Sequence, residues 1–358
     1  MLKVLVNTIL ILLVAGLTSC LHDGELKLEN NGFVPVNKSD NWVISTPENE
    51  NMDAGLLNKA YDLVYDDRRF LMARSLLVIR NGKLVAEAYP YDRTDIDRIH
   101  NIQSCTKTFT SLMAGIALQK GHLDSLTQKL SDIYPGHFTG FEDKEDITLY
   151  DALSMRTGLE FNNDTNTLGL YQTEESSVEF VLSKDKLYEP GTVFHYNDGS
   201  PHLVSGAIQQ GSGQSLGDYA GINLFEPLGI EEWMWEEASD GVTFGAFSLF
   251  LKPRDMAKVG QLLINKGMWD GQQLIDSIWI KKATDIQGSA NFNGASYGLY
   301  FWVFPSYKGY AAEGHGGQIL FVVPEKQLVI VYTAWPYTSS MLWDEYTELV
   351  DIITAACK

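Results

Sequence analysis

A serine and a lysine stand three residues apart at the start of an apolar helix, and together they can do chemistry. Ser104 and Lys107 are followed by residues 109–118, whose apolar side chains recur at helical spacing. Residues three apart share one helix face, so the amine can lie beside the hydroxyl. Burial disfavours the charged form of a lysine, and a serine beside such a base becomes a nucleophile. The first helical turn also offers N–H groups to a developing oxyanion.

Two later segments carry groups that could complete such a site. Tyr196 follows a Pro-Gly turn, and a buried tyrosine near a lysine ammonium can relay protons. His315, Gly316 and Gly317 interrupt a strand pattern, where glycines often mark close approach of a ligand. His315 can supply a polar edge, and the Gln318 N–H can be a second oxyanion donor beside that of the serine. Each feature alone also fits a structural role, as core packing for the tyrosine or a bulge for the glycines.

A second serine, Ser215, lies in a Gly-x-Ser-x-Gly run that matches the nucleophile elbow of another hydrolase class. That elbow requires a buried strand directly before it, whereas residues 206–212 are polar and helical in pattern. We therefore expect Ser215 to cap the helix that follows it.

Composition and charge narrow the classes of function. The chain has 358 residues, a net charge of -19 and an apolar fraction of 45%. The acidic balance argues against nucleic acid, because phosphate binding needs a basic face. No His or Cys spacing resembles a zinc site and no Gly-rich phosphate loop is present. The pattern predicts neither a metal nor an organic cofactor.

The N-terminus has the features of an export signal. Lys3 precedes an apolar stretch that is too short for a comfortable membrane span, and Leu17-Thr18-Ser19-Cys20 resembles a lipobox. We expect residues 1–19 to be a lipoprotein signal peptide and Cys20 to receive lipid. Residues 20–52 are polar and suit a flexible tether. The protein is then exported and anchored by lipid in a membrane, on its periplasmic or cell-surface face.

The order of elements predicts an α+β fold. Residues 75–89 form a hairpin pattern around Asn81-Gly82, and further strand patterns lie between residues 297 and 334. The middle of the chain is mostly helical. We expect residues 53–103 and 243–358 to form an antiparallel sheet covered by helices, and residues 104–242 to form an inserted helical domain. A cleft between two such bodies is a common place for a site.

Taken in order, the three clusters resemble those of the serine β-lactamase and penicillin-binding-protein-like superfamily. The class C-like branch is the closer match, and it includes esterases, D-aminopeptidases and 6-aminohexanoate-dimer hydrolases. Its motifs correspond here to Ser104-x-x-Lys107, Tyr196-Asn197-Asp198 and His315-Gly316-Gly317. The resemblance covers roughly residues 55–355 and implies the β-lactamase/transpeptidase-like fold. Asp198 stands where β-lactamases usually have Asn, and His315 stands where they usually have a Lys that binds the substrate carboxylate.

The resemblance implies a serine hydrolase that acts on small esters or amides, or on peptides containing D-residues, through an acyl-enzyme on Ser104. Lys107 and Tyr196 would move protons, and Asp198 and His315 would shape the substrate pocket beside Gly316 and Gly317. One alternative is a β-lactamase, a D-Ala-D-Ala carboxypeptidase or a D-aminopeptidase. Another is a sensor or binding lipoprotein that is acylated and only slowly released.

Overall fold

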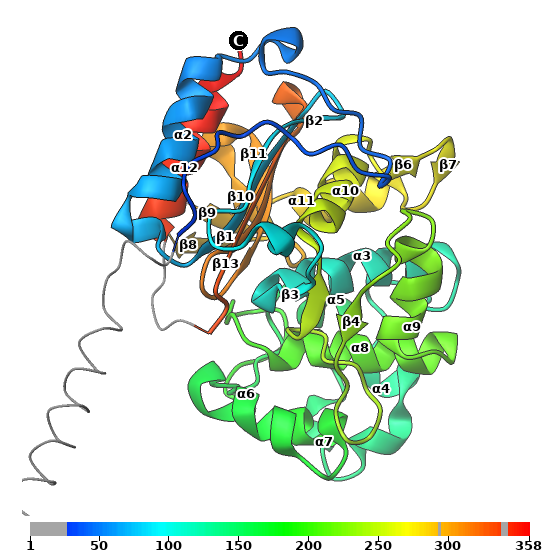
Figure 1. Cartoon of the computed structure of the whole chain (residues 1–358). Helices are drawn as coiled ribbons and strands as arrows, with labels where there is room; N and C mark the ends of the chain where they lie inside the picture. Colours follow the sequence, from blue (N-terminus) through cyan, green and yellow to red (C-terminus); the bar gives the residue numbers. More distant parts are fainter. Residues whose placement is uncertain (1–26, 293–294, 338–342) are drawn as a thin grey trace, which may run out of the picture.

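The computed structural model describes residues 27–292, 295–337 and 343–358, and an eight-stranded antiparallel sheet lies at the centre of its upper part (Figure 1). The strand order is β2-β1-β13-β12-β11-β10-β9-β8, so the first and last strands of the chain are neighbours. The strands are β1 (Ala73–Arg80), β2 (Lys83–Ala88), β8 (Gly288–Phe292), β9 (Ala295–Tyr297), β10 (Trp302–Phe304), β11 (Gly309–Gly314), β12 (Gln318–Val323) and β13 (Leu328–Ala334).

Two features of the sequence explain how the sheet forms: a dipeptide suited to a tight hairpin turn, and continuous apolar stretches that form buried strands. Asn81 and Gly82 have φ of 53° and 76°, the left-handed backbone of a tight hairpin turn, and they join β1 to β2 as the sequence predicts. Both β1 and β13 are buried along their whole length and pair in antiparallel register, with Val78 opposite Ile330. The predicted α+β fold is confirmed.

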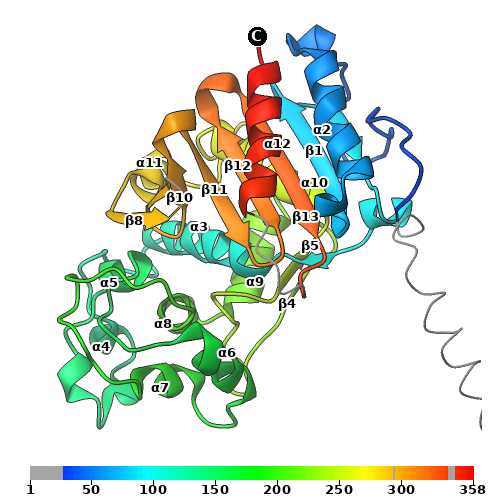
Figure 2. The same cartoon turned by 90° about the vertical axis from the view of Figure 1, so that its left-hand side faces the viewer.

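Helices cover both faces of the sheet. Helices α2 (Ala54–Asp66) and α12 (Trp343–Ala356) lie side by side on one face (Figure 2). Helices α10 (Pro253–Ile264) and α11 (Ser277–Thr284) lie on the opposite side (Figure 1). Asp53 caps α2 by accepting hydrogen bonds from the N–H groups of Gly55 and Leu56.

The central part of the chain is mainly helical and lies below the sheet in both views (Figures 1 and 2). Helix α3 (Thr106–Gln119) contacts both β11 and helix α8, so the predicted division at residues 104 and 242 stays a prediction. The other helices of this part are α4 (Leu130–Ile133), α5 (Leu149–Leu153), α6 (Asn163–Gln172), α7 (Ser177–Leu182), α8 (Gly199–Ser212) and α9 (Leu216–Ala220). Short strands complete the fold: β3 (His100–Asn101), β4 (Met234–Trp235), β5 (Leu249–Leu251), β6 (Met268–Trp269) and β7 (Gln272–Gln273).

Residues 28–45 run along strand β2. The Leu84 N–H donates to Val43 O and the Ser45 N–H donates to Leu84 O, at 3.0 and 3.1 Å. The Trp42 indole packs against the core and donates to the backbone of Arg254. The described part of the predicted flexible tether thus lies against the sheet, because Phe33, Trp42 and backbone groups find partners there, whereas Val34, Val36 and Val43 are exposed.

The predicted signal peptide and Cys20 lie outside the described residues. Among the residues that are described, no helix is both long and apolar enough to cross a membrane.

Candidate active site

Ser104 lies in the 3₁₀ turn Gln103–Cys105 that leads directly into α3. The turn is held by Asn101, whose side-chain oxygen accepts from the Gln103 N–H at 2.8 Å. Gln103 has a φ of 51°, a left-handed backbone that non-glycine residues rarely adopt and that is often found at functional sites. Ser104 lines a cavity of about 1080 Å³ between the sheet and the helical part of the chain.

Lys107 lies behind Ser104 and is 1% exposed. Its Nζ donates to Ser104 Oγ at 2.8 Å, to Asp198 Oδ1 at 2.7 Å and to Ala246 O at 3.1 Å. An ammonium has three N–H donors, so these three acceptors satisfy it fully. The helical spacing from Ser104 to Lys107 thus places the amine beside the hydroxyl, as the sequence predicts.

The charge of Lys107 differs from the sequence expectation. Burial lowers the pKa of this amine, but the Asp198 carboxylate and the Tyr196 phenol oppose that effect, and the net pKa is raised. The resting lysine is therefore an ammonium that donates to Ser104, and burial alone does not make it a base.

Tyr196 completes the group from a loop that precedes α8. Its phenol lies close enough to Ser104 and Lys107 for both to lower its pKa, and Lys107 Nζ lies 4.9 Å from the centroid of its ring. Its ring lies edge-on to Tyr297, with centroids 5.9 Å apart, and packs against Trp302. Burial raises the pKa of the Tyr196 phenol, and the nearby lysine only partly offsets this, so the resting phenol is neutral.

Two side chains of helix α6 hydrogen-bond to Asp198. Its Oδ2 accepts from Thr167 Oγ1 at 2.6 Å, and its backbone N–H donates to Asn163 Oδ1 at 2.9 Å. Both partners come from α6, which also contributes to the cavity wall. Sequence reasoning missed Thr167 and Asn163, because no local pattern links α6 to a loop about thirty residues later.

The glycine-rich segment forms a turn between β11 and β12, closed by a hydrogen bond from the Gly317 N–H to Gly314 O at 3.2 Å. Gly314 and His315 line the cavity, whereas Gly316, Gly317 and Gln318 are not among its lining residues.

Gln318 is fully buried beneath this turn. Its side-chain amide donates to Ala334 O at 2.8 Å, and its backbone oxygen accepts from Cys105 Sγ at 3.2 Å. Gln318 is not among the residues that line the cavity, and the predicted role of its N–H as oxyanion donor stays a prediction. Cys105 is a buried free cysteine.

Gly314 explains how the turn approaches the nucleophile. A Cβ at this position would lie 2.4 Å from Ile102 O and 3.0 Å from Gln103 Cβ, so a larger residue would push β11 away. The end of β11 therefore packs against the backbone that leads into Ser104.

A buried acid in the cavity wall escaped the sequence analysis. Glu313, beside Gly314 on β11, lines the cavity and is 4% exposed. Its Oε1 accepts from Tyr346 Oη of α12 at 2.6 Å. Burial raises the pKa of Glu313 to about 8, although the Tyr346 hydrogen bond lowers it. The available signal is a lone acid within the strand pattern of residues 309–314.

Other polar clusters do not offer comparable chemistry. Ser215 caps α9 by accepting from the Asp218 N–H at 3.2 Å and does not line the cavity, as expected from its sequence context. Among the described residues, no group of His, Cys, Asp and Glu side chains is arranged to hold a metal ion.

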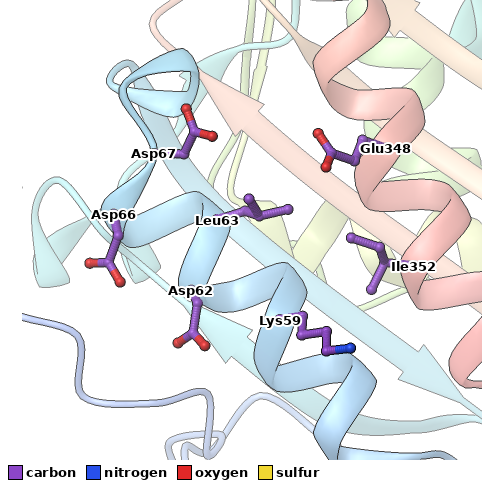
Figure 3. Close-up of a pocket in the computed structure, with 7 residues that line it drawn as sticks. All are labelled: Lys59, Asp62, Leu63, Asp66, Asp67, Glu348 and Ile352. Atoms are coloured by element: carbon purple, nitrogen blue, oxygen red, sulfur yellow. The ribbon is translucent and has the colours of Figure 1, made fainter.

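A second cavity lies between α2 and α12, the two helices that lie side by side on one face of the sheet (Figure 3). Its volume is about 560 Å³, and its lining contains no serine, cysteine or histidine. We therefore place the chemistry in the Ser104 cavity. The residues that line the second cavity are Lys59, Asp62, Leu63, Asp66, Asp67, Glu348 and Ile352.

Comparison with known proteins shows what the chain is similar to. The family model described as Beta-lactamase matches residues 71–341. A 6-aminohexanoate-dimer hydrolase from Paenarthrobacter ureafaciens is 21% identical over 303 residues, which cover 75% of this chain and 74% of that protein.

Solved structures share the fold. A protein from Bacillus anthracis, provisionally described as a 6-aminohexanoate-dimer hydrolase, superposes with a TM-score of 0.72 at 20% identity, covering 93% of this chain and 92% of that one. A family VIII carboxylesterase superposes with a TM-score of 0.68 at 15% identity, covering 88% and 98%.

Proposed function

Because the chain belongs to the beta-lactamase family and is a hydrolase of that family, we propose that it cleaves small esters or amides through an acyl-enzyme on Ser104. One observation carries the proposal. Lys107 donates to Ser104 Oγ and the Tyr196 phenol lies beside both at the wall of a cavity, although the tyrosine is about ninety residues from the lysine in sequence. Converging donors and acceptors around a serine are what nucleophilic catalysis requires.

Attack by Ser104 requires that the Lys107–Tyr196 pair has first lost one proton. The resting pair holds an ammonium on Lys107 and a neutral phenol on Tyr196. In the reactive form the phenol has lost its proton and the ammonium stabilises the phenolate. Ser104 Oγ then attacks the substrate carbonyl while its proton moves to the Tyr196 oxygen, and Tyr196 passes that proton to the leaving group as the acyl bond breaks.

The oxyanion needs two N–H donors. The backbone N–H of Ser104 lies at the start of the helical segment, where amides point along the positive end of the helix dipole. We assign the second donor to the backbone N–H of His315, because this residue lines the cavity and Gln318 does not. Water then attacks the ester, and Tyr196 removes a proton from that water.

The cavity wall favours esters and amides over carboxylate-bearing β-lactams. Among its described lining residues, Asp164, Asp198, Glu236 and Glu313 are acidic, and none is Lys or Arg. Asp198 is paired with Lys107 and Glu313 is protonated at neutral pH, so a substrate carboxylate would face the negative charges of Asp164 and Glu236. No lysine or arginine among the described lining residues would attract it. The apolar part of the wall suits short acyl or aromatic groups and comprises Leu168, Tyr171, Phe194, Phe247, Phe250, Trp302 and Tyr337.

Active-site labelling tests the proposal directly. We expect a fluorophosphonate probe to modify the peptide that contains Ser104, and we expect Ser104→Ala to lose both labelling and p-nitrophenyl ester turnover. Ser215→Ala is the matched control and should keep both. Labelling at Ser215 would contradict the assignment, and a stoichiometric burst without steady turnover would instead support the sensor alternative.

Export and lipid anchoring of the protein at Cys20 remain part of the proposal. The sequence of residues 1–20 supports it. Metabolic labelling with a radioactive fatty acid should mark the wild-type protein and not Cys20→Ala, and equal labelling of both would contradict lipidation at this cysteine.

A further inference from the structure

Glu313 places a buried carboxyl group in the wall of the reaction cavity. The residue is 4% exposed and stands one position before Gly314. Gly314 packs so closely on Ile102 O that no Cβ fits between them. The Glu313 backbone is therefore anchored against the segment that carries Ser104, and a substrate bound at Ser104 lies beside this part of the wall.

No lysine or arginine stands among the described lining residues to balance this carboxyl group. Its hydrogen-bond partner, Tyr346 Oη at 2.6 Å, is a neutral donor. The other titratable groups that sense it are Cys105, in the turn before α3, and Tyr297 of β9, and His315 follows two residues along the chain. By contrast, the Asp198 carboxylate in the same cavity is paired with the Lys107 ammonium.

We propose that Glu313 selects substrates that carry a positively charged amine, an inference that rests on the proposed ester and amide hydrolysis. A buried carboxylate is costly to ionise unless a cation pairs with it. A substrate ammonium can supply that cation. The remaining acids of the wall, Asp164 and Glu236, add to the same preference and repel anionic substrates.

The preference depends on pH in a defined direction. Burial raises the pKa of Glu313 to about 8, so the empty cavity holds a protonated acid at neutral pH. Pairing with a substrate cation stabilises the ionised form, and a proton leaves Glu313 for solvent as the substrate binds. The advantage of a cationic substrate should therefore grow as the pH rises toward about 8 and then level off.

Isosteric substrate pairs test the inference on the whole protein. On the leaving-group side, acetylthiocholine is compared with its uncharged tert-butyl isostere. On the acyl side, the p-nitrophenyl ester of trimethylammonio-butyrate is compared with its tert-butyl isostere. Turnover of the neutral member tests the proposed function, and the ratio of kcat/KM between the two members tests the inference. We expect the cation to be preferred by about tenfold or more in at least one pair.

Two variants separate Glu313 from the general negative charge of the protein. Glu313→Gln keeps the shape and an acceptor for Tyr346, and its ratio should fall to about one. Glu325→Gln removes an exposed acid far from the cavity and should keep the wild-type ratio. An equal ratio in Glu313→Gln and wild type would overturn the inference.

The wild-type protein alone provides a second test, which does not depend on folding of a variant. A kcat/KM ratio of one or less in both pairs, or a ratio that stays constant between about pH 6 and pH 9, would also overturn it.

Discussion

Two buried acids line the reaction cavity and differ in their partners. We call the part of the wall around Asp198 the paired end and the part around Glu313 the unpaired end. At one end, Asp198 is paired with the Lys107 ammonium at 2.7 Å and with the Thr167 hydroxyl at 2.6 Å. At the other end, Glu313 has the neutral Tyr346 hydroxyl as its partner and no lysine or arginine in the described lining. The carboxylate at the paired end is neutralised by an ammonium, whereas the carboxyl group at the unpaired end is neutralised by its own proton.

This difference shows that burial alone does not decide the charge of a group. Lys107 and Glu313 are both almost fully removed from water, yet the lysine stays charged and the acid becomes neutral. The partner decides, because a carboxylate beside the amine outweighs the cost of burial and a phenol beside the acid does not. The paired end can therefore serve proton transfer, and the unpaired end can serve recognition.

Breaking the paired end should have the largest effect. Lys107→Met removes the ammonium that holds Ser104 Oγ and stabilises the Tyr196 phenolate, so we expect kcat/KM to fall about a thousandfold or more. It also leaves Asp198 buried without a cation, which should lower the free energy of unfolding by about 3–5 kcal/mol. Ester kinetics and urea unfolding measure the two effects.

The matched control for this change is Lys282→Met, an exposed lysine in the last turn of α11. It should change neither quantity measurably. Turnover of Lys107→Met close to that of wild type would contradict the role of the paired end.

Neutralising the acid of the pair should shift the pH profile. In Asp198→Asn the interaction that raises the pKa of Lys107 is lost and the lowering effect of burial remains. The Lys107–Tyr196 pair then loses its first proton at lower pH, so the rising limb of kcat/KM should move down by about one pH unit or more.

Asp164→Asn is the control, since it removes the same charge from the exposed rim of the cavity. In Asp164→Asn the rising limb of the kcat/KM profile should stay at its wild-type pH. An identical shift in both variants would mean that net charge, and not the pair, sets the profile.

The protonation of Glu313 should make the free energy of unfolding depend on pH. The pKa of Glu313 is raised from an ordinary 4.5 to about 8 in the folded protein. Its stabilising contribution is complete below pH 4.5 and is lost as the pH rises through about 8. Relative to Glu313→Gln, the wild type should lose on the order of 3–5 kcal/mol across this range. Urea unfolding of both proteins at acidic and alkaline pH measures this, and parallel pH curves would contradict it.

The smallest effect concerns the partner of Glu313. The Tyr346 hydrogen bond lowers the pKa of Glu313, so Tyr346→Phe should move the alkaline loss of stability up by less than about one pH unit. Tyr307→Phe removes a similar hydrogen bond, from Tyr307 to Asp351 of α12, and should leave the position of that loss unchanged. A downward shift in Tyr346→Phe would contradict the sign of this interaction.

The sequence predicts those parts of the site that depend on local spacing. Ser104 and Lys107 share a helix face, and the Asn81-Gly82 hairpin forms because its turn chemistry is local. The ordered motifs also place Tyr196 in the same site, which spacing alone cannot do.

The rest depends on contacts between distant segments. The charge of Lys107 is set by Asp198, 91 residues away, and the sequence argument from burial alone gives the opposite direction. The choice between His315 and Gln318 depends on where the strand ends and the turn begins, and a motif does not specify that. Glu313 escapes notice because its hydrogen-bond partner, Tyr346, lies in the last helix of the chain.

The segment of residues 28–45 decides how this protein should be shortened for experiments. Strand β2 is the outermost strand of the sheet, and this segment occupies its open hydrogen-bonding groups while Asp40 neutralises Arg254. A version that starts at Asp53 would bare a row of unsatisfied amides and carbonyls, a template on which a second molecule can add a strand. Such a version should self-associate, whereas one that retains residues 27–52 keeps the hydrogen-bonding groups at the edge of β2 paired.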